Sequence, residues 1–365
     1  MKKILVIRLS SLGDVVLTAP ILYAMRKKAG VEVHLLTKPK MSDLLHGGEA
    51  ADKFYTLGED GLWAKLKAEK YDGVLDLHCN FRSYWVLLNL FFGTSRVFQL
   101  DWLGEGYKKK RLMRWLYVKT KSARFKVSHV QQRYLEAAVK LVAELGGEKF
   151  EINDWATGLP EHPRNCEDPK APVQDPKASL QGSAGNQDFL PINSPLNYGV
   201  AILGGTYETK KIPKSVWIDV FQQDNRKWYL IGGNNEKGLA GELVAEFGDR
   251  LIDGVGMFDL ETSSRCIALS DVVVGGDTGF SHVAAAYNKP LLVIWGSTDP
   301  GLGFAAGYKN KNVFHLVSKN LSCHPCSKLG FDACPKGHFR CMKDYSAQEI
   351  KLLLQKLQAN SLGGH

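Results

Sequence analysis

The 365-residue sequence contains no apolar run long enough to cross a lipid bilayer. Its longest run, YWVLLNLFF after Ser83, falls well short of the roughly 20 residues that a membrane-spanning helix needs. A signal-peptide core is also lacking, because Lys2 and Lys3 are followed only by ILVI, a pattern typical of a β-strand. We therefore expect a cytosolic protein, unless it binds a membrane from outside.

A disulfide framework is not expected either. Seven cysteines, an odd number, in a large chain without an export signal argue against it. Four of them, Cys323, Cys326, Cys334 and Cys341, lie close together in CHPCSKLGFDACPKGHFRC. This spacing could bind zinc, but six residues separate the last two cysteines where a zinc ribbon has two. An ordered loop without metal is the favoured interpretation, and a zinc site is the alternative.

Acidic residues are absent between Lys108 and Lys126, a segment with nine Lys or Arg in a chain whose net charge is +9. A solvated helix face would explain most such runs. Here Trp115, Tyr117 and Phe125 alternate with the basic residues, which suits contact with anionic lipid headgroups or phosphates. Nucleic acid is the alternative partner, but we find no recognition motif for it and expect none to bind.

Strand and helix patterns alternate through both halves of the chain. The first half has strand-like segments KKILVIRL, VEVHLLT, KFYTL and YDGVLDLH. Helical patterns separate and follow them, the first from Val15 to Lys28, which Pro20 either starts or kinks. The second half repeats the alternation with YGVAILGG, KWYLIGG, RLIDGVG, DVVVGGD, PLLVIWGS and NVFHLV. This order predicts an α/β fold with two doubly wound parallel sheets.

The periodicity disappears between residues 160 and 197, where Pro, Asn, Asp and Gly dominate and aromatic residues are few. Such a segment cannot bury enough apolar surface to order itself. We predict a first domain over 1–159, a linker or mobile loop over 160–197 and a second domain over 198–343. Residues 344–365 should form a helix that packs back on the body, followed by a flexible tail.

Glycine-rich turns follow three strands of the second half, in GGTYETKK, GGNNE and GGDTGFSH. Ligands of such sheets bind beyond the carboxyl ends of the strands, so the three turns should meet at one cleft. Thr278 and the amides that follow it begin a helix, which is an arrangement that cradles a diphosphate. Lys210 or Lys211 could add positive charge there, and the acids Asp277 and Glu236 would face sugar or ribose hydroxyls.

Each of these features also has a purely structural explanation. Glycine-rich turns are common in α/β proteins, a lone His282 is more often a capping or core residue, and Glu236 could simply be solvated. Their occurrence at successive strand ends favours a nucleotide-diphosphate site.

Four segments, SSLGDVVLTAP, DLHCNFRS, GGDTGFSHVAAAYNKPLLVIWGSTDPG and CHPC…CPKGHFRCM, together resemble glycosyltransferase family 9, the ADP-heptose:lipopolysaccharide heptosyltransferases. The resemblance covers nearly the whole chain except the linker. It implies a GT-B architecture, in which two Rossmann-like domains face a cleft, with the donor in the C-terminal domain and the acceptor in the N-terminal one. It also implies an inverting transfer that needs no metal or other cofactor, and no Asp-x-Asp metal motif occurs in the chain.

The resemblance implies roles for individual residues. Asp14 looks like the catalytic base, Glu236 a ribose contact and Met257 a wall of the adenine site. The full donor set is Thr206, Lys210, Glu236, Met257, Asp277, Thr278, Gly279 and His282. Acceptor contacts are expected from Arg8, Ser10, Ser11, Gly13, Arg82 and Ser83, although Arg82 could equally be a surface salt-bridge residue. Lys-Ile in TYETKKIP departs from the family pattern, which makes the donor less certain than the fold.

Asp14 is an unusual residue for the first turn of a nucleotide-binding fold, where a negative charge repels phosphate. An inverting displacement requires one carboxylate on the acceptor side, which takes the proton of the attacking hydroxyl. The structural alternative is that Asp14 caps a helix beginning at Val15, worth roughly 1 kcal/mol. The side chain could do both, and the donor signature in the other half favours catalysis.

We thus expect an enzyme that moves a heptose or related sugar from an ADP-sugar to an anionic lipopolysaccharide-core or lipid A-type acceptor. It would act in the cytoplasm, held at the inner face of the cytoplasmic membrane by the basic segment from Lys108 to Lys126. The alternatives are a relative that uses another nucleotide sugar, a nucleotide-sugar epimerase, and a non-catalytic protein that binds anionic glycolipid.

Overall fold

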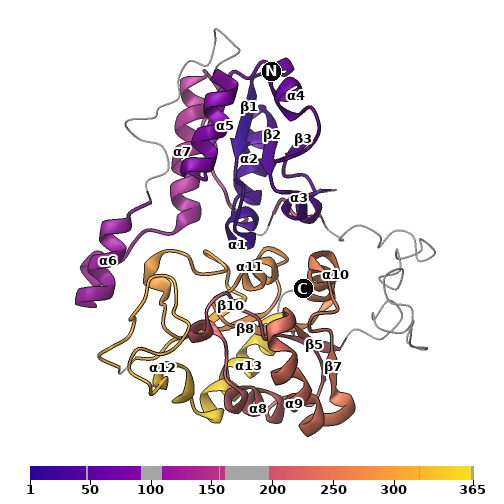
Figure 1. Ribbon diagram of the computed structural model, residues 1–365, viewed down its shortest axis with the longest axis vertical. Helices are drawn as coiled ribbons and strands as arrows, with labels where there is room; N and C mark the ends of the chain where they lie inside the picture. The colour runs from indigo at the N-terminus through magenta and orange to yellow at the C-terminus, as the bar shows by residue number, and fades with distance from the viewer. Residues whose placement is uncertain (47, 92–108, 156, 161–196, 320, 363–365) are drawn as a thin grey trace, which may run out of the picture.

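The structure, a computed structural model, describes residues 1–46, 48–91, 109–155, 157–160, 197–319 and 321–362. Lys108 and nearly all of the predicted linker lie outside these residues. The described chain forms two stacked halves, each built on its own sheet (Figure 1). We call the residues up to 160 the N-terminal half and those from 197 the C-terminal half. No helix in the described part of the chain is both long and apolar enough to cross a membrane.

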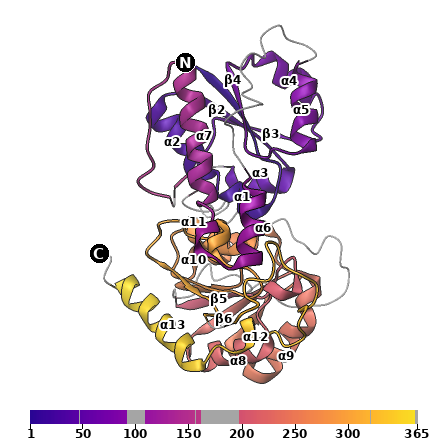
Figure 2. The same ribbon diagram turned by 90° about the vertical axis from the view of Figure 1, so that its left-hand side faces the viewer.

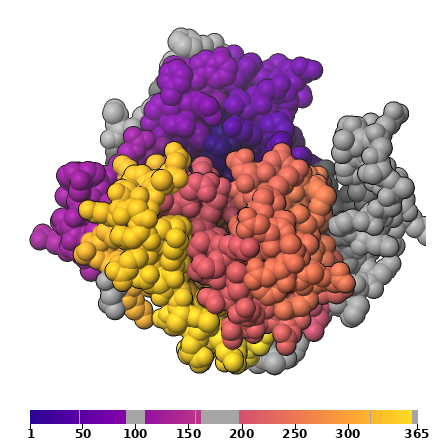
Figure 3. Space-filling view, turned by 60° about the horizontal axis from the view of Figure 1, so that its bottom comes forward, coloured from indigo at the N-terminus to yellow at the C-terminus, as the bar shows by residue number. Residues whose placement is uncertain are grey.

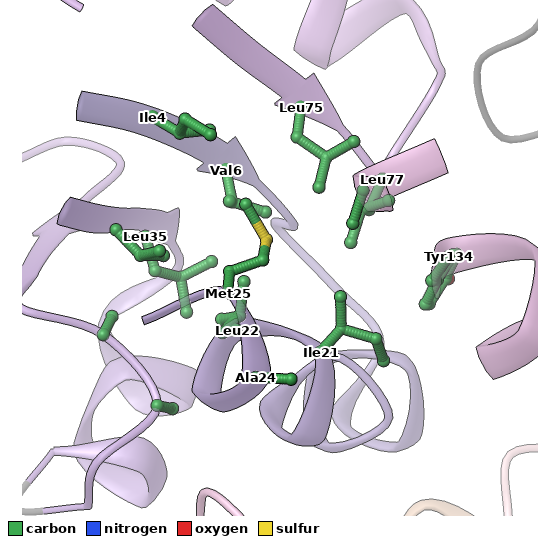
Figure 4. Packing of buried hydrophobic residues seen from close by; sticks show 14 of the residues in the cluster. Ile4, Val6, Ile21, Leu22, Ala24, Met25, Leu35, Leu75, Leu77 and Tyr134 are labelled. Carbon is green, nitrogen blue, oxygen red and sulfur yellow. The ribbon is translucent and has the colours of Figure 1, made fainter. Parts of the chain in front are cut away.

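The N-terminal sheet has four parallel strands in the order β3-β2-β1-β4. They are β1 (Lys3–Ile7), β2 (Glu32–Thr37), β3 (Lys53–Thr56) and β4 (Gly73–Asp76). Side chains alternate between the faces of a strand. Ile4 and Val6 therefore pack with α2 (Ala19–Ala29) and α7 (Val130–Glu144) (Figure 4). On the other face, Leu5 and Ile7 pack with α4 (Leu62–Ala68) and α5 (Phe81–Phe91).

The first predicted helix is in fact two. A short α1 (Leu12–Val16) is followed by Leu17 and Thr18, and α2 then starts at Ala19 with Pro20 in its first turn. Proline has no N–H to donate and fits the first turn of a helix, so the chain breaks before it. The prediction of one helix from Val15 to Lys28 is therefore wrong, whereas the alternative that Pro20 starts a helix is confirmed.

The C-terminal sheet has six parallel strands in the order β10-β9-β8-β5-β6-β7. They are β5 (Tyr198–Ile202), β6 (Lys227–Ile231), β7 (Leu251–Asp253), β8 (Val272–Gly275), β9 (Leu291–Ile294) and β10 (Val313–Leu316). Numbered from β5, this is the 3-2-1-4-5-6 order of a Rossmann fold. The order reverses between β5 and β8, and in the N-terminal sheet between β1 and β4. Ligands of such sheets bind at these switch points.

Helices cover both faces of the C-terminal sheet. Side chains of α8 (Lys214–Gln222), α9 (Lys237–Phe247), α12 (Arg340–Lys343) and α13 (Ala347–Leu362) share one buried cluster. On the opposite face lie α10 (Leu260–Leu269) and α11 (Gly279–Ala286). The C-terminal segment, yellow in Figure 3, lies beside the rose-coloured segment of the same half, with Ile350, Leu354 and Leu357 buried. The 3₁₀ turns are η1 (Ala123–Phe125), η3 (Glu208–Lys210), η4 (Asn234–Glu236), η5 (Gly248–Arg250) and η6 (Pro300–Leu302).

The two halves meet through apolar packing as well as polar contacts. Val16 of α1 and Leu44 of α3 (Pro39–Leu45) belong to the same buried cluster as α10 and α11 of the other half. A second connection is α6 (Arg111–Thr120), which belongs to the N-terminal half in sequence but lies against the C-terminal half (Figure 2). Both contacts hold the halves together.

Candidate functional site

Asp14 is the third residue of α1, directly beyond the carboxyl end of β1. Its Oδ2 accepts hydrogen bonds from the Ser11 amide at 3.4 Å and the Ser11 hydroxyl at 3.1 Å, and it pairs with Nη2 of Arg8. Within the described chain, no hydrogen bond reaches the other oxygen, Oδ1. Ser11, not Asp14, is the N-cap of this helix, which corrects the suggestion that Asp14 caps a helix starting at Val15. The Asp14 side chain instead accepts a hydrogen bond from the amide of Ser11, as in a capping box.

Arg8 holds this carboxylate from a fixed position. It is 6 % exposed and lies just after β1, where its Nη1 donates to the Leu77 carbonyl oxygen. Its guanidinium lies 5.7 Å from the centre of the Tyr134 ring. A buried arginine with three such partners restricts how Asp14 can turn.

The surroundings of Asp14 are cationic. Burial, together with the nearby charges of Arg8, Lys109 and Arg82, lowers the pKa of His78 to about 4, while Asp14 acts in the opposite direction. Burial also lowers the pKa of Lys109. His78 is therefore neutral at pH 7, and the fixed positive charges next to it attract anions to this side.

The start of α11 forms the opposite side of the site. Thr278 is the N-cap in extended conformation (φ −135°, ψ 170°), so the first amides of the helix have no helical partner. The Thr278 Oγ1 is buried and makes no hydrogen bond within the described chain. A buried hydroxyl without a partner and a helix N-terminus together suit an anionic ligand.

Two lysine–carboxylate pairs border the start of α11. Lys210 Nζ lies 2.7 Å from Asp277 Oδ2, which also accepts a hydrogen bond from the Thr298 hydroxyl at 2.9 Å. Lys211 Nζ lies 2.8 Å from Glu236 Oε1, and the other oxygen of Glu236 accepts from the Gly233 amide at 2.8 Å. Asp277 and Glu236 are thus both neutralised.

Two glycines allow α1 and α11 to pack against each other. A Cβ added at Gly13 would lie 2.5 Å from Cδ2 of His282, and one added at Gly279 would lie 2.9 Å from Cβ of Leu12. A side chain of the other half therefore packs directly against the backbone of each glycine. Burial lowers the pKa of His282, while Asp277 and Asp14 act against this shift, so the ring sits between both sides of the site.

These elements surround a cavity of about 560 Å³ between the two halves. It is the size of a typical small-molecule site. Ten of the predicted site residues line it: Ser11, Gly13, Asp14, Thr206, Lys210, Glu236, Asp277, Thr278, Gly279 and His282.

A sequence comparison decides the family. The family model for glycosyltransferase family 9 (heptosyltransferase) matches residues 61–331. The chain belongs to this family. It is a glycosyltransferase, as its sequence motifs predict.

Individual relatives of this family 9 glycosyltransferase cover most of its length. Lipopolysaccharide heptosyltransferase 1 of Pseudomonas aeruginosa is 23% identical over 354 residues, which cover 89% of this chain and 86% of the relative. Lipopolysaccharide heptosyltransferase 1 of Salmonella typhimurium is 24% identical over 339 residues, covering 88% and 96%.

Solved structures show the same fold. A family 9 glycosyltransferase of Veillonella parvula matches with a TM-score of 0.67 at 18% identity, covering 98% of each chain. The ADP-heptose lipopolysaccharide heptosyltransferase II of E. coli matches with a TM-score of 0.64 at 16% identity, covering 100% of each. The predicted GT-B architecture, two parallel-sheet α/β domains facing a cleft, is confirmed.

Five predicted site residues do not line the cavity of this family 9 chain: Arg8, Ser10, Met257, Arg82 and Ser83. Arg8 lies behind Asp14, and Met257 is 55% exposed. Ser83 is fully buried, and its Oγ both accepts from the Asn80 amide and donates to the Asn80 carbonyl at 3.0 Å. It holds the turn before α5, which corrects its predicted contact with an acceptor.

Sequence reasoning missed other residues that line the cavity, among them Asn235, Asp299, Phe304 and Lys328. Asp299 could have been found, because GSTDP follows β9 just as the glycine turns follow their strands. Lys328 belongs to the cysteine-rich loop, where no periodic sequence pattern indicates which way a side chain points.

The four clustered cysteines of the glycosyltransferase lie near one another. Burial, together with the thiols of Cys326, Cys334 and Cys323, raises the pKa of Cys341 to about 12. The Cys323 sulfur lies 3.8 Å from Nε2 of His338. In the described residues, ligand atoms close enough to share one metal ion occur only at Glu32, His34 and Glu69. There, Lys3 and Lys53 pair with Glu69 at 2.5 and 2.7 Å, so ammonium groups already neutralise the carboxylate.

Proposed function

We propose that this chain transfers a heptose from an ADP-sugar to an anionic lipopolysaccharide-core acceptor by one inverting displacement, with Asp14 as the general base. The observation that carries this proposal is the position of Asp14. One carboxylate oxygen is held by Arg8 and Ser11. The other accepts no hydrogen bond in the described chain and belongs to a residue that lines the cavity. A base must be held in this way while keeping one oxygen available.

The donor side of the proposal uses the C-terminal half. Solved structures of an E. coli heptosyltransferase contain ADP and ADP-2-deoxy-2-fluoro heptose, and both match this chain over 97% of its length. We assign the diphosphate to Thr278, the first amides of α11 and Lys210. These groups would stabilise the charge that develops on the leaving ADP, so the reaction needs no metal. Asp277 would bind sugar hydroxyls, Glu236 the ribose, and Met257 would lie by the adenine.

The acceptor side uses the N-terminal half. Arg8, Lys109 and Arg82 surround His78 and Asp14, so phosphate or carboxylate groups of an acceptor would be attracted there. The basic segment has further exposed charges at Lys110, Arg111, Lys119, Arg124 and Lys126. We assign these to anionic lipid headgroups at the inner face of the cytoplasmic membrane, where each basic side chain near the surface is worth about 1 kcal/mol.

Replacing Asp14 with Asn tests the central role. The amide is nearly isosteric but cannot take a proton, so we expect kcat to fall by about 10² to 10⁴, the usual contribution of a general base. The measurement is release of ADP from ADP-heptose in the presence of a lipopolysaccharide-core acceptor. Binding of ADP, followed by calorimetry, should persist because Lys210 and Thr278 are untouched.

Asp43→Asn is the matched control, because Asp43 is exposed on α3 and does not line the cavity. It should react at the wild-type rate. Full activity of Asp14→Asn would show that Asp14 is not the base.

Three further measurements test the rest of the proposal. NMR of the product gives the configuration of the new glycosidic bond and so tests inversion. Activity in the presence of EDTA tests metal independence, and a panel of nucleotide sugars tests the identity of the donor. Product formed without acceptor would instead identify an epimerase.

A further inference from the structure

Helix α5 is apolar on both of its faces. Its inner face packs on the N-terminal sheet through Val86, Leu87 and Leu90, which are at most 5% exposed. Its outer face carries residues spaced i, i+3, i+4 and i+7, all facing solvent: Phe81 (83% exposed), Tyr84 (41%), Trp85 (47%) and Leu88 (49%). A surface helix of a globular protein normally has a polar outer face. The fold therefore explains only the inner face.

These side chains form a patch rather than a random scatter. Within the described residues, ten large hydrophobic side chains are exposed, and six of them lie on α5 or α6. Single exposed apolar residues are normal, but contiguous ones mark an interaction surface. On α5 the patch extends to α4, because the Trp63 and Trp85 rings meet edge to face at 5.1 Å.

On α5 and α6 the patch is bordered by positive charge. Neither α5 nor α6 contains an acidic residue, whereas Arg82 and Arg111 are both exposed. Arg111 lies close enough to Tyr84 to counteract the rise that burial causes in the pKa of that phenol. Exposed aromatic and aliphatic side chains next to arginines, without acids, complement an anionic lipid interface. A protein partner would more often show mixed charges.

We propose that the outer face of α5, formed by Phe81, Tyr84, Trp85 and Leu88, inserts into the headgroup region of an anionic bilayer. This inference rests on the lipid-linked acceptor of the proposed function and adds to it the element that enters the lipid. Figure 2 shows α4 and α5 together at one edge of the N-terminal half, away from α2 and α7. The turn into α5 begins just after β4, at the same sheet edge as Asp14, and Arg82 and Asp14 both act on His78. Docking by α5 would thus bring the acceptor side of the cavity to the membrane surface.

Vesicle sedimentation tests the docking directly. The full chain is mixed with vesicles of phosphatidylcholine and phosphatidylglycerol, or of phosphatidylcholine alone, and we expect tighter binding to the anionic ones. The variant Phe81→Ser with Leu88→Ser should bind the anionic vesicles about tenfold more weakly or worse, because binding scales with buried apolar area. Leu352→Ser is the matched control, since Leu352 is 46% exposed on α13, and it should bind as wild type.

Tryptophan fluorescence provides a second measurement at the helix itself. Brominated lipid tails should quench the wild-type protein on binding, and Trp85→Phe should lose a large part of this quenching while its melting temperature stays close to that of wild type. Equal vesicle binding by the Phe81→Ser, Leu88→Ser variant, or unchanged quenching in Trp85→Phe, would overturn the proposal. Neither measurement involves sugar transfer, so an inactive protein that still docks contradicts the proposed function alone.

Discussion

Thr278 carries a hydroxyl oxygen that is buried and makes no hydrogen bond within the described chain. Leaving such a group unsatisfied costs about 1 to 3 kcal/mol. Proteins keep such an unsatisfied group mainly where it binds a ligand, and Thr278 lines the cavity at the start of α11. We therefore expect the hydroxyl to donate to the donor diphosphate.

Replacing Thr278 with Val tests this role, because valine has the same shape without the hydroxyl. We expect the dissociation constant of ADP to rise about tenfold to a hundredfold, the value of a hydrogen bond to a charged group. The free energy of unfolding should stay equal or increase. Calorimetric titration and urea denaturation measure the two quantities.

Thr18→Val is the control for the same substitution at a satisfied site. The buried Thr18 hydroxyl donates to the Val15 carbonyl at 2.6 Å, so its loss should cost about 1 kcal/mol of stability and leave ADP binding alone. If Thr278→Val lowers the free energy of unfolding but leaves the dissociation constant of ADP unchanged, the Thr278 hydroxyl stabilises the fold and does not bind the donor.

Residue positions were predictable from the sequence where chain direction alone decides them. Asp14 follows the first strand, and Thr278 follows a later one, so both had to lie at the carboxyl edges of their sheets. The partner of each side chain was not predictable. That Asp14 pairs with Arg8, and Lys210 with Asp277, depends on rotamers and on contacts between distant segments, which leave no local pattern.

The contact between α1 and α11 holds the N-terminal side of the cavity against its C-terminal side. It depends on Gly13, where an added Cβ would lie 2.5 Å from the His282 ring. His282 is 8% exposed and has little room to move, so the clash would push the two helices apart. A displacement of about 1 Å in a reacting pair can cost a hundredfold in rate.

We accordingly expect Gly13→Ala to lower kcat by up to about a hundredfold. Affinity for ADP should change little, since the proposed diphosphate contacts lie in the other half. Steady-state kinetics together with ADP titration separates the two effects. Gly238→Ala on α9 is the matched control: no atom lies within 4 Å of an added Cβ, and the helix should gain about 0.5 to 1 kcal/mol. A Gly13→Ala enzyme with wild-type kcat would show that this contact does not position the reactants.

Elements were predictable to the extent that their patterns are periodic. The strands of both sheets, α7 and α13 have clear apolar repeats, and the structure contains each of them. The break between α1 and α2 is less visible, because the apolar pattern continues through Leu17 and only Pro20 marks the boundary. The outer face of α5 could not be recognised either, since YWVLLNLFF alone fits a buried helix equally well.

At the scale of the whole molecule, the two halves and their parallel sheets follow from the alternation of strands and helices, but their mutual arrangement does not. The basic segment illustrates the difference. Arg114 is buried, with its Nε 2.9 Å from the Leu302 carbonyl and its guanidinium 3.7 Å from the centre of the Phe304 ring. Tyr117 donates to Asp299 at 2.7 Å. Part of a segment predicted to face a membrane therefore connects the halves, a contact between residues almost 190 positions apart.

His129 makes a further connection between the halves, and its chemistry predicts how the whole molecule responds to acid. It precedes α7, and its ring stacks on Tyr308 of the other half at 4.4 Å. Nδ1 accepts from the Gln131 amide, so Nε2 carries the proton and donates to the Ala305 carbonyl at 2.7 Å. Only the neutral ring can make both bonds. Burial accordingly lowers its pKa to about 4.

Because the folded pKa lies below the value of about 6.5 for an unfolded histidine, the unfolded chain binds the proton first as the pH falls. The stabilisation is complete above about pH 6.5 and is lost progressively down to about pH 4. We expect urea denaturation to show a free energy of unfolding that falls between pH 6.5 and 4.5, with His129 contributing roughly 1 kcal/mol per pH unit. His129→Gln should be less stable at pH 7 but should lose less on acidification, because one titrating group is gone. If its pH dependence equals that of wild type, His129 does not couple the halves to pH, and the acid sensitivity comes from His78 and His315, whose pKa values burial also lowers to about 4.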